Sequence, residues 1–120
     1  MANILIVDDL ASEAQLMAGV VTSLGHHPII VNDGTIALAT AKTAAPGLIL
    51  LDVVMPGLNG FETCRKIKRD AATADIPIVM VTTKDQETDK FWANKQGASG
   101  YVVKPFSPDD LATAIRTHLR

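Results

Sequence analysis

Residues 48–52, Leu-Ile-Leu-Leu-Asp, decide the fold class of this chain, because four large apolar residues in a row stop abruptly at an acid. Residues 4–7, Ile-Leu-Ile-Val, form a similar run that also stops at an acid, and residues 77–81, Pro-Ile-Val-Met-Val, form one that stops at Thr82. Short runs that are continuously apolar, rather than alternating, are typical of parallel strands buried on both faces. Residues 28–31 and 101–103 read as two further strands of the same kind.

Helical patterns fill the intervals between these runs. After the first run, apolar residues fall on one helical face: Leu10, Ala14, Met17, Val21 and Leu24. An alanine-rich helix is expected after Asp33-Gly34, and a helix with Phe61, Cys64 and Ile67 on one side follows the third run. A polar helix is expected over 86–96. The last helix is capped by Ser107 and buries Leu111, Ile115 and Leu119. Five strand–helix pairs in succession predict an α/β fold, a doubly wound five-stranded parallel sheet with helices on both faces.

Composition restricts the class of protein. The chain has 120 residues, 11 basic and 13 acidic side chains, a net charge of −2 and 48% hydrophobic residues, which suits one globular domain over residues 1–120. The single cysteine, Cys64, excludes an internal disulfide framework. Without a membrane-length apolar run, a signal-like start or a basic excess, we expect a cytoplasmic protein that binds neither membrane nor nucleic acid directly.

Polar side chains follow four of the five expected strands. They are Asp8 and Asp9, Asp52, Thr82 and Lys104. Each alone fits a helix cap, a loop or a surface ion pair, but the carboxyl ends of parallel strands meet at one edge, where such folds bind ligands. Three carboxylates beside one another need a cation, and an all-oxygen set favours Mg²⁺, with Mn²⁺ as an alternative.

This set of groups suits phosphoryl transfer to a carboxylate. Aspartate is an accepted covalent phosphoryl acceptor, and Asp52, at the end of the central strand, is the best candidate. Asp8 and Asp9 are better placed as metal ligands. The Thr82 hydroxyl and the Lys104 ammonium would bind the phosphoryl oxygens.

These motifs together resemble the receiver domain of bacterial response regulators. The resemblance rests on Asp8-Asp9, on Leu50-Leu51-Asp52 with Met55-Pro56-Gly57 and Gly60 downstream, on Val81-Thr82 and on Lys104-Pro105-Phe106, and it runs from Asn3 to the C-terminus. It implies a flavodoxin-like (βα)5 sheet of order 2-1-3-4-5. A receiver is a signalling domain and not an enzyme in the usual sense, although it catalyses its own phosphorylation and slow dephosphorylation.

The resemblance also assigns roles to single residues. Asp52 would be the phosphoacceptor and Asp9 the more direct of the two acidic metal ligands, with the Val54 backbone carbonyl completing the protein's share of the Mg²⁺ shell. Thr82 would be the switch hydroxyl, Lys104 the phosphate-binding lysine and Tyr101 the aromatic switch. Lys104-Pro105 would be a cis peptide, and Pro105 would belong with Tyr101 to the switch and partner surface.

A closer resemblance lies in residues 81–90, Trp92, residues 96–98 and residues 54–61, which are similar to stand-alone regulators of the chemotaxis-like systems that govern type IV pili and twitching motility. It implies a chemotaxis-type histidine kinase as phosphodonor and no output domain. The output would then be phosphorylation-dependent binding to an unidentified protein, with a monomer as the default state. A phosphate sink and a phosphorylation-independent scaffold remain alternatives.

Four residues stand out as modifiers or partner contacts. Val54 stands where many relatives carry a polar side chain, and Thr83 stands where many carry a small one. These two differences predict altered rates of phosphorylation and hydrolysis. Phe91 and Trp92 are adjacent on a polar helix. Either one ring is core and shields the other, or both form an exposed partner patch.

Two rival functions share parts of the pattern. A flavin binder of the same topology would need a phosphate-binding loop after the first strand, where Asp8-Asp9-Leu10 would repel phosphate. A phosphatase of the haloacid dehalogenase type also forms an aspartyl phosphate, but its Asp-x-Asp signature does not occur at residues 8–11.

Overall fold

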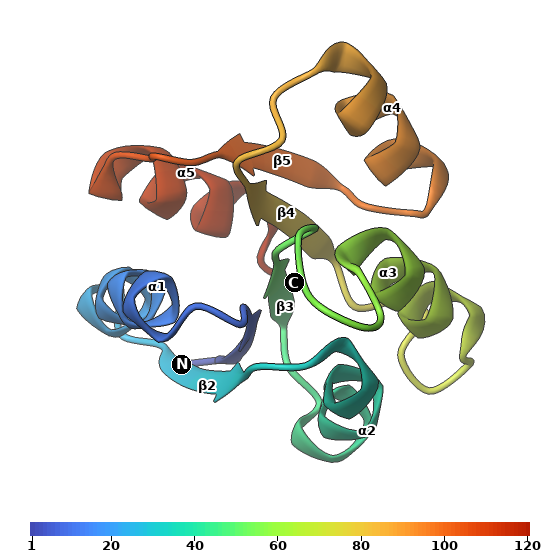
Figure 1. Ribbon diagram of the computed structural model, residues 1–120. Coiled ribbons are helices and arrows are strands. Elements are labelled where there is room, and N and C mark those ends of the chain that lie inside the picture. The colour runs from blue at the N-terminus through green and yellow to red at the C-terminus, as the bar shows by residue number, and fades with distance from the viewer.

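The computed structural model describes residues 1–120 as five strands that alternate with five helices (Figure 1). In chain order the elements are β1 (Asn3–Val7), α1 (Ala11–Ser23), β2 (His27–Val31), α2 (Gly34–Ala44), β3 (Leu48–Leu51), α3 (Gly60–Arg69), β4 (Ile78–Thr82), α4 (Glu87–Lys95), β5 (Gly100–Val103) and α5 (Pro108–His118). All neighbouring strands are parallel, and their order is β2-β1-β3-β4-β5. The predicted fold class and strand order are confirmed.

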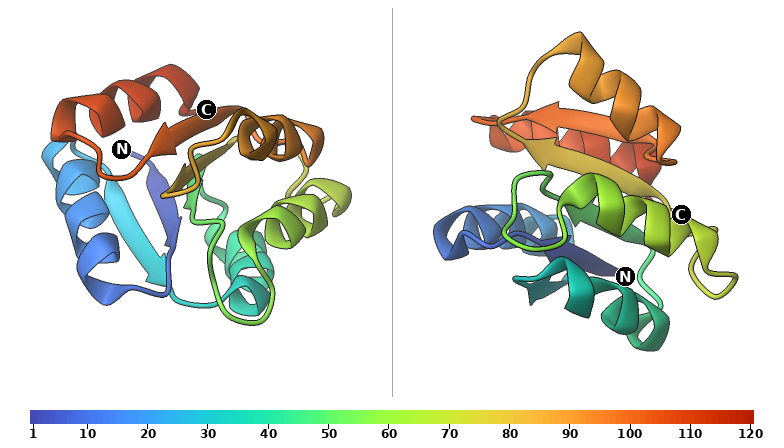
Figure 2. Two further views of the ribbon diagram at one scale, coloured as in Figure 1. Left: turned by 45° about the horizontal axis from the view of Figure 1, so that its top comes forward. Right: turned by 45° about the vertical axis from the view of Figure 1, so that its right-hand side comes forward.

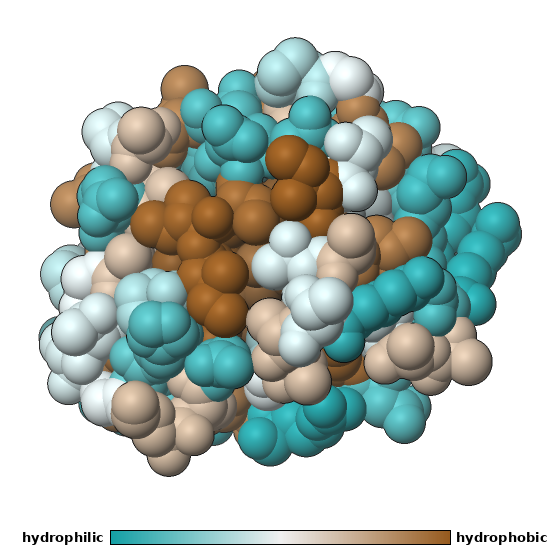
Figure 3. Space-filling view, turned by 90° about the horizontal axis from the view of Figure 1, so that it is seen from below, coloured by the Kyte–Doolittle hydropathy of each residue, from teal (hydrophilic) through white to brown (hydrophobic).

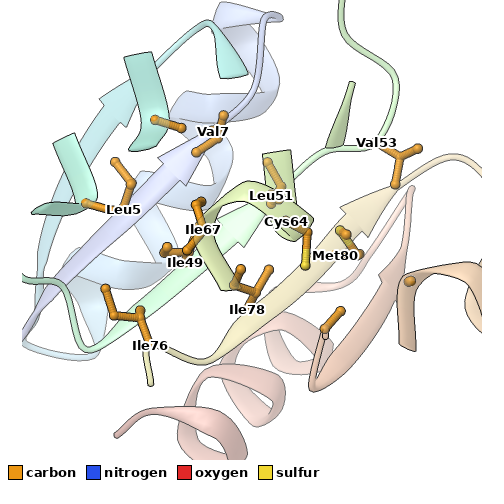
Figure 4. Close-up of a cluster of buried hydrophobic side chains, with 14 of the residues drawn as sticks. Leu5, Val7, Ile49, Leu51, Val53, Cys64, Ile67, Ile76, Ile78 and Met80 are labelled. Carbon is orange, nitrogen blue, oxygen red and sulfur yellow. The ribbon is translucent and has the colours of Figure 1, made fainter. Parts of the chain in front are cut away.

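Helices cover both faces of the sheet, and each face has its own core. Figures 1 and 2 show α1 and α5 on one side and α2, α3 and α4 on the other. Successive residues of a strand point to opposite faces, so Leu5 and Val7 join the cluster beneath α2 and α3, drawn in Figure 4, whereas Ile4 and Ile6 pack under α1 and α5. No helix is both long and apolar enough to span a bilayer.

Burial on both faces holds for the three inner strands and not for the edges. Every residue of β3 and β4 is buried, as are the four apolar residues of β1. The edge strands β2 and β5 have no fully buried residue, and Ile30 of β2 is 38% exposed. An edge strand lacks a neighbour on one side, so the expectation of two-sided burial was wrong for these two runs.

Local signals set the helix boundaries with one exception. Ser107 caps α5 by accepting a hydrogen bond from the Asp110 N–H at 3.0 Å, and Pro108 opens the helix, as predicted. Leu10, however, was expected on the buried stripe of α1 and is 54% exposed. It precedes the first helical residue in extended backbone, which turns its side chain away from that stripe.

Gly60 determines how closely α3 approaches the end of β3. A Cβ at residue 60 would lie 2.1 Å from the Asp52 carbonyl oxygen and 2.6 Å from the Val53 Cα. The Gly60 N–H instead donates to the Val53 carbonyl at 2.9 Å. Only glycine allows this approach, which fixes the backbone around Asp52.

Candidate functional site

The four strand-end groups predicted from the sequence converge at one buried edge of the sheet. Asp8 follows β1, Asp52 follows the central strand β3, Thr82 ends β4, and Lys104 follows β5. Their exposed fractions are 1%, 4%, 0% and 7% in that order, which is unusual for charged side chains. Polar groups buried so deeply need partners. Lys104 pairs with Asp8 and Asp52, whereas the Thr82 hydroxyl oxygen accepts from the Lys84 N–H.

Lys104 contacts both buried carboxylates of the site. Its Nζ lies 2.7 Å from Asp8 Oδ2 and 3.4 Å from Asp52 Oδ2, so one ammonium bridges two carboxylates. The Lys104 N–H donates to the Thr82 carbonyl at 2.8 Å, which extends the β4–β5 ladder to the base of the side chain. The peptide bond from Lys104 to Pro105 is cis, as the resemblance implied.

Backbone amides hold the two buried carboxylates in place. The Leu10 N–H donates to Asp8 Oδ1 at 2.9 Å, and the Val54 N–H donates to Asp52 Oδ1 at 3.2 Å. In each case the donor lies two residues after the acid, so the loop that leaves the strand turns back over its carboxylate. The oxygens that face Lys104 are therefore oriented by the fold itself.

The electrostatics of the pair combine burial with mutual attraction. Burial raises the pKa of Asp8, and the hydrogen bonds from Lys104 and from the Leu10 amide only partly oppose this. Burial alone would lower the pKa of Lys104, but the hydrogen bond to Asp8 and the charge of Asp52 outweigh it and raise that pKa. Lys104 therefore stays cationic at neutral pH.

The carboxylates of Asp8, Asp9 and Asp52 form a group that fits a divalent cation. One oxygen from each lies within 4.8 Å of the others, and Asp9 is half-buried at the solvent side. When ionised, three carboxylates and one ammonium leave the site two negative charges in excess. Hard oxygen donors with that excess match the chemistry of Mg²⁺ or Mn²⁺.

Tyr101 and Thr82 both contact the segment between β4 and α4. The Tyr101 hydroxyl donates to the Lys84 carbonyl at 2.7 Å, and the Lys84 N–H donates to Thr82 Oγ1 at 3.4 Å. Burial and nearby carboxylates raise the pKa of Tyr101 to about 12. Lys84 therefore lies between the two residues predicted to act as switches.

Phe91 and Trp92 are both exposed on α4, at 56% and 54%. Their rings make an edge-to-face contact with centroids 5.9 Å apart, and Lys95 Nζ lies 5.4 Å from the Phe91 centroid. The alternative in which one ring belongs to the core is wrong. The helix buries the small Ala93 instead, which leaves both rings on its outer side.

The other predicted modifiers lie at the surface around the site. Val54 is 51% exposed, and Thr83 and Pro105 are exposed as well. Sequence reasoning missed a groove of about 380 Å³ beside Asp9 and one of about 340 Å³ beside Lys104. The second groove is lined by Leu16, an apolar residue that does not belong to the buried stripe of α1. That position of Leu16 was the one feature of the sequence that could have indicated this groove.

This fold and site define a class of protein, and comparison with known proteins agrees. The model of the response regulator receiver domain family matches residues 4–116, so the chain belongs to this family. Its members are signalling domains that accept a phosphoryl group. Asp8, Asp9 and Asp52 form the acidic pocket that is typical of this class.

Among individual proteins, the chain is 43% identical to protein PilH of Pseudomonas aeruginosa, over 99% of this chain and 98% of that protein. It is 38% identical to the DNA-binding response regulator MtrA of Mycobacterium tuberculosis, but it spans only 50% of that relative's length. Among solved structures, the chemotaxis protein CheY4 of Vibrio cholerae superposes with a TM-score of 0.94 at 34% identity, covering 99% of both chains. The chain is thus similar to PilH and to a chemotaxis protein over nearly the whole of each, and to half of a DNA-binding response regulator.

Proposed function

We propose that this protein is a phosphorylation switch in which Asp52 accepts a phosphoryl group from a chemotaxis-type histidine kinase. The observation that carries the proposal is the position of Asp52. It lies at the end of the central strand, 3.4 Å from the Lys104 ammonium, and has one oxygen held by a backbone amide. An oriented carboxylate beside a fixed cation is poised to attack phosphorus.

The transfer needs no residue beyond those at the site. A carboxylate oxygen of Asp52 forms a bond to phosphorus while the bond from phosphorus to the donor nitrogen breaks, and the electron pair of that bond leaves with the imidazole. Lys104 neutralises charge on the phosphoryl oxygens, and the Thr82 hydroxyl donates to one of them. Hydrolysis later returns Asp52 to a free carboxylate and releases phosphate.

A Mg²⁺ ion would be held by Asp8, Asp9 and Asp52, together with the Val54 carbonyl. When bound, it would neutralise developing charge on the phosphoryl group. Asp8 already shares its charge with Lys104 at 2.7 Å, so Asp9, which has no cationic partner, is the more direct ligand.

Phosphorylation would alter the segment between β4 and α4. Movement of Thr82 toward the phosphoryl group would pull on the N–H of Lys84, the residue whose carbonyl accepts the hydrogen bond from the Tyr101 hydroxyl. Tyr101 would then turn inward, and the exposed Phe91 and Trp92 on the following helix would change their presentation to a protein partner.

The groove beside Lys104 offers an approach for the phosphodonor. It is lined by Glu13 and Leu16 of α1 and by Pro105 and Phe106 after β5, with Lys104 at its floor. Leu16 is 62% exposed, so the groove that contains Lys104 also presents an apolar contact. A donor helix seated there would bring its histidine toward Asp52.

The similarity to PilH over nearly the whole of both proteins supports a role in pilus-based motility. The signal would then pass through protein binding and not through direct contact with DNA. The balanced charge and the absence of a membrane-spanning helix are consistent with action in the cytoplasm.

The test is intact-mass spectrometry after incubation with acetyl phosphate, on wild type and Asp52→Asn, with and without Mg²⁺. We expect one added phosphoryl group that requires Mg²⁺ and is absent from the variant. Asp75→Asn, which changes an exposed acid far from the site, is the matched control and should be labelled like wild type.

No adduct on wild type, with Trp92 fluorescence unchanged by beryllofluoride, would favour a phosphorylation-independent scaffold. An adduct with no change in partner binding would favour a phosphate sink.

The lifetime of the aspartyl phosphate would depend on Val54 and Thr83. Val54 presents an apolar side chain two residues after Asp52, and Thr83 follows the buried Thr82 at the exposed mouth of the site. We expect Thr83→Ala to change the rate of acyl-phosphate loss, because it alters the path of the attacking water. Equal lifetimes for wild type and Thr83→Ala would refute this part.

A further inference from the structure

Helix α1 has a second groove on the side that faces away from Lys104. This β2 groove, of about 380 Å³, lies between α1 and α2 over the open edge of the sheet. We define it by Ala14 and Gln15 of α1, Ile30 and Val31 of β2, Ile36 of α2, and Asp9 at the end nearest the acidic pocket. Apart from Asp8 and Asp9 at that end, the proposed phosphotransfer uses none of the residues that line it.

Apolar surface gathers in this groove. Ile30 is 38% and Ile36 48% exposed, although both are large aliphatic side chains. Figure 3, seen from the side of β2 and α2, shows hydrophobic atoms collected near the middle of this face with hydrophilic atoms around them. A gathered apolar surface of this kind on a small domain marks a contact site more often than scattered single residues do.

The backbone of β2 does not favour an added strand. The His27 N–H donates to the Ala2 carbonyl and the Val31 carbonyl accepts from Asp8, so alternate residues of β2 turn toward β1. Pro28 and Ile30 are left on the outer side, and proline has no N–H to donate. An extended peptide would find a single free donor along this edge, whereas a helix could cover the edge without needing any.

Charge selects the kind of helix. Two acidic residues line the groove: Asp8, which is buried and paired with Lys104, and the half-buried Asp9, which has no cationic partner. No lining residue is basic. Asp33, which caps α2 one turn before Ile36, adds a further carboxylate close by. A second copy of this chain would place like charges face to face, so the lining disfavours a symmetric dimer here.

We propose that the β2 groove is a docking site for a cationic amphipathic helix of a protein partner, with its apolar face on Ile30 and Ile36 and a lysine or arginine toward Asp9. Helix-in-groove recognition of this type reads apolar anchors at helical spacing. The groove shares Asp9 with the acidic pocket, so its occupant would be positioned next to the phosphorylation site. The two grooves on either side of α1 would serve different partners.

The test uses the full chain, labelled with ¹⁵N, in metal-free buffer. The probe is an amphipathic helical peptide of leucine and lysine, compared with a leucine–glutamate peptide of the same pattern and with a scrambled leucine–lysine peptide. We expect the first peptide alone to shift the amide signals of β2, the first half of α1 and the start of α2, in a saturable manner.

Two variants assign the contact. Ile36→Ser should weaken binding of the leucine–lysine peptide about tenfold, because it removes an apolar anchor. Leu16→Ser, the same loss of an exposed aliphatic side chain on the other side of α1, should leave it unchanged. Both positions are exposed, so neither substitution should disturb folding, and the amide spectrum of each free variant checks this.

Three results would overturn the proposal. Equal binding of the scrambled peptide would show that only the charge of the peptide matters and not its apolar face. Equal binding of the leucine–glutamate peptide would show that the groove does not select a cationic helix. A dimer in sedimentation that dissociates in Ile36→Ser would assign the face to a second copy. These outcomes do not depend on phosphorylation, so they are separate from the acetyl phosphate experiment.

Discussion

Replacing Lys104 by methionine tests whether the buried ion pairs hold the site together. At an effective dielectric constant of 20, the separations of 2.7 and 3.4 Å from Lys104 Nζ to Asp8 and Asp52 correspond to gross attractions of about 6 and about 5 kcal/mol. Desolvation of the three groups cancels most of this. Removing one partner of such a cluster costs about 3–5 kcal/mol, because a buried charge is left uncompensated.

We expect Lys104→Met to lose about 3 kcal/mol of unfolding free energy at pH 8 in metal-free buffer, at the low end of that range because Asp8 can take up a proton. With an unfolding entropy of about 0.25 kcal/mol/K for a chain of this length, Tm should fall by about 12 °C. Urea unfolding followed by circular dichroism measures the loss. Lys66→Met, which changes an exposed lysine without an ion pair, should stay within about 0.5 kcal/mol of wild type.

The pH dependence of the stability loss in Lys104→Met tests whether charge causes it. Burial raises the pKa of Asp8 in the folded protein, and loss of the Lys104 hydrogen bond raises it further. Above its unfolded pKa, a carboxyl with a raised folded pKa binds more protons in the folded state, so its contribution to stability falls as pH rises. The deficit of Lys104→Met should therefore be smaller at pH 5 than at pH 8. An equal deficit at both pH values would mean that lost packing and not charge is responsible, and no deficit at pH 8 would refute the reasoning.

Three further predictions follow from other contacts. Gly60→Ala should lower stability by at least about 2 kcal/mol in urea unfolding, because its Cβ meets backbone at 2.1 Å and no side chain can yield; an unchanged midpoint would contradict the close approach. Tyr101, the only tyrosine, should ionise near pH 12 in an absorbance titration of the folded protein. Because its pKa is raised in the folded state, the free energy of unfolding should fall as pH rises above about 10. A titration midpoint near 10 would contradict the burial of Tyr101. Cys64, with its pKa raised to about 12 by burial, should react with a thiol reagent at pH 8 only on unfolding, and rapid reaction of the native protein would exclude its place in the core.

Much of the fold could be predicted because its signals are local. The continuous apolar runs that became β1, β3 and β4 need no partner to be recognised, and the cap at Ser107 depends on residues three positions apart. The groups of the candidate site could be found for the same reason. Each follows a strand directly, and parallel strands bring their carboxyl ends to one edge.

Other features could not be predicted because they depend on residues far apart in the chain. Whether Phe91 or Trp92 enters the core depends on how α4 lies against β5, and the structure leaves both outside. The exposure of Leu10 depends on where α1 begins, which the turn back onto Asp8 decides. The β2 groove exists only because α1 and α2 lie on opposite faces of an edge strand.

The amino-acid sequence by itself determined the strand–helix alternation and the groups at the strand ends, since period, capping and turn chemistry act over a few residues. Only the tertiary structure decided that the Lys104 ammonium, 96 residues from Asp8, bridges Asp8 and Asp52. It also decided which apolar side chains stay in water. Both outcomes depend on burial, and burial is a property of the whole packed sheet that no short stretch of sequence carries.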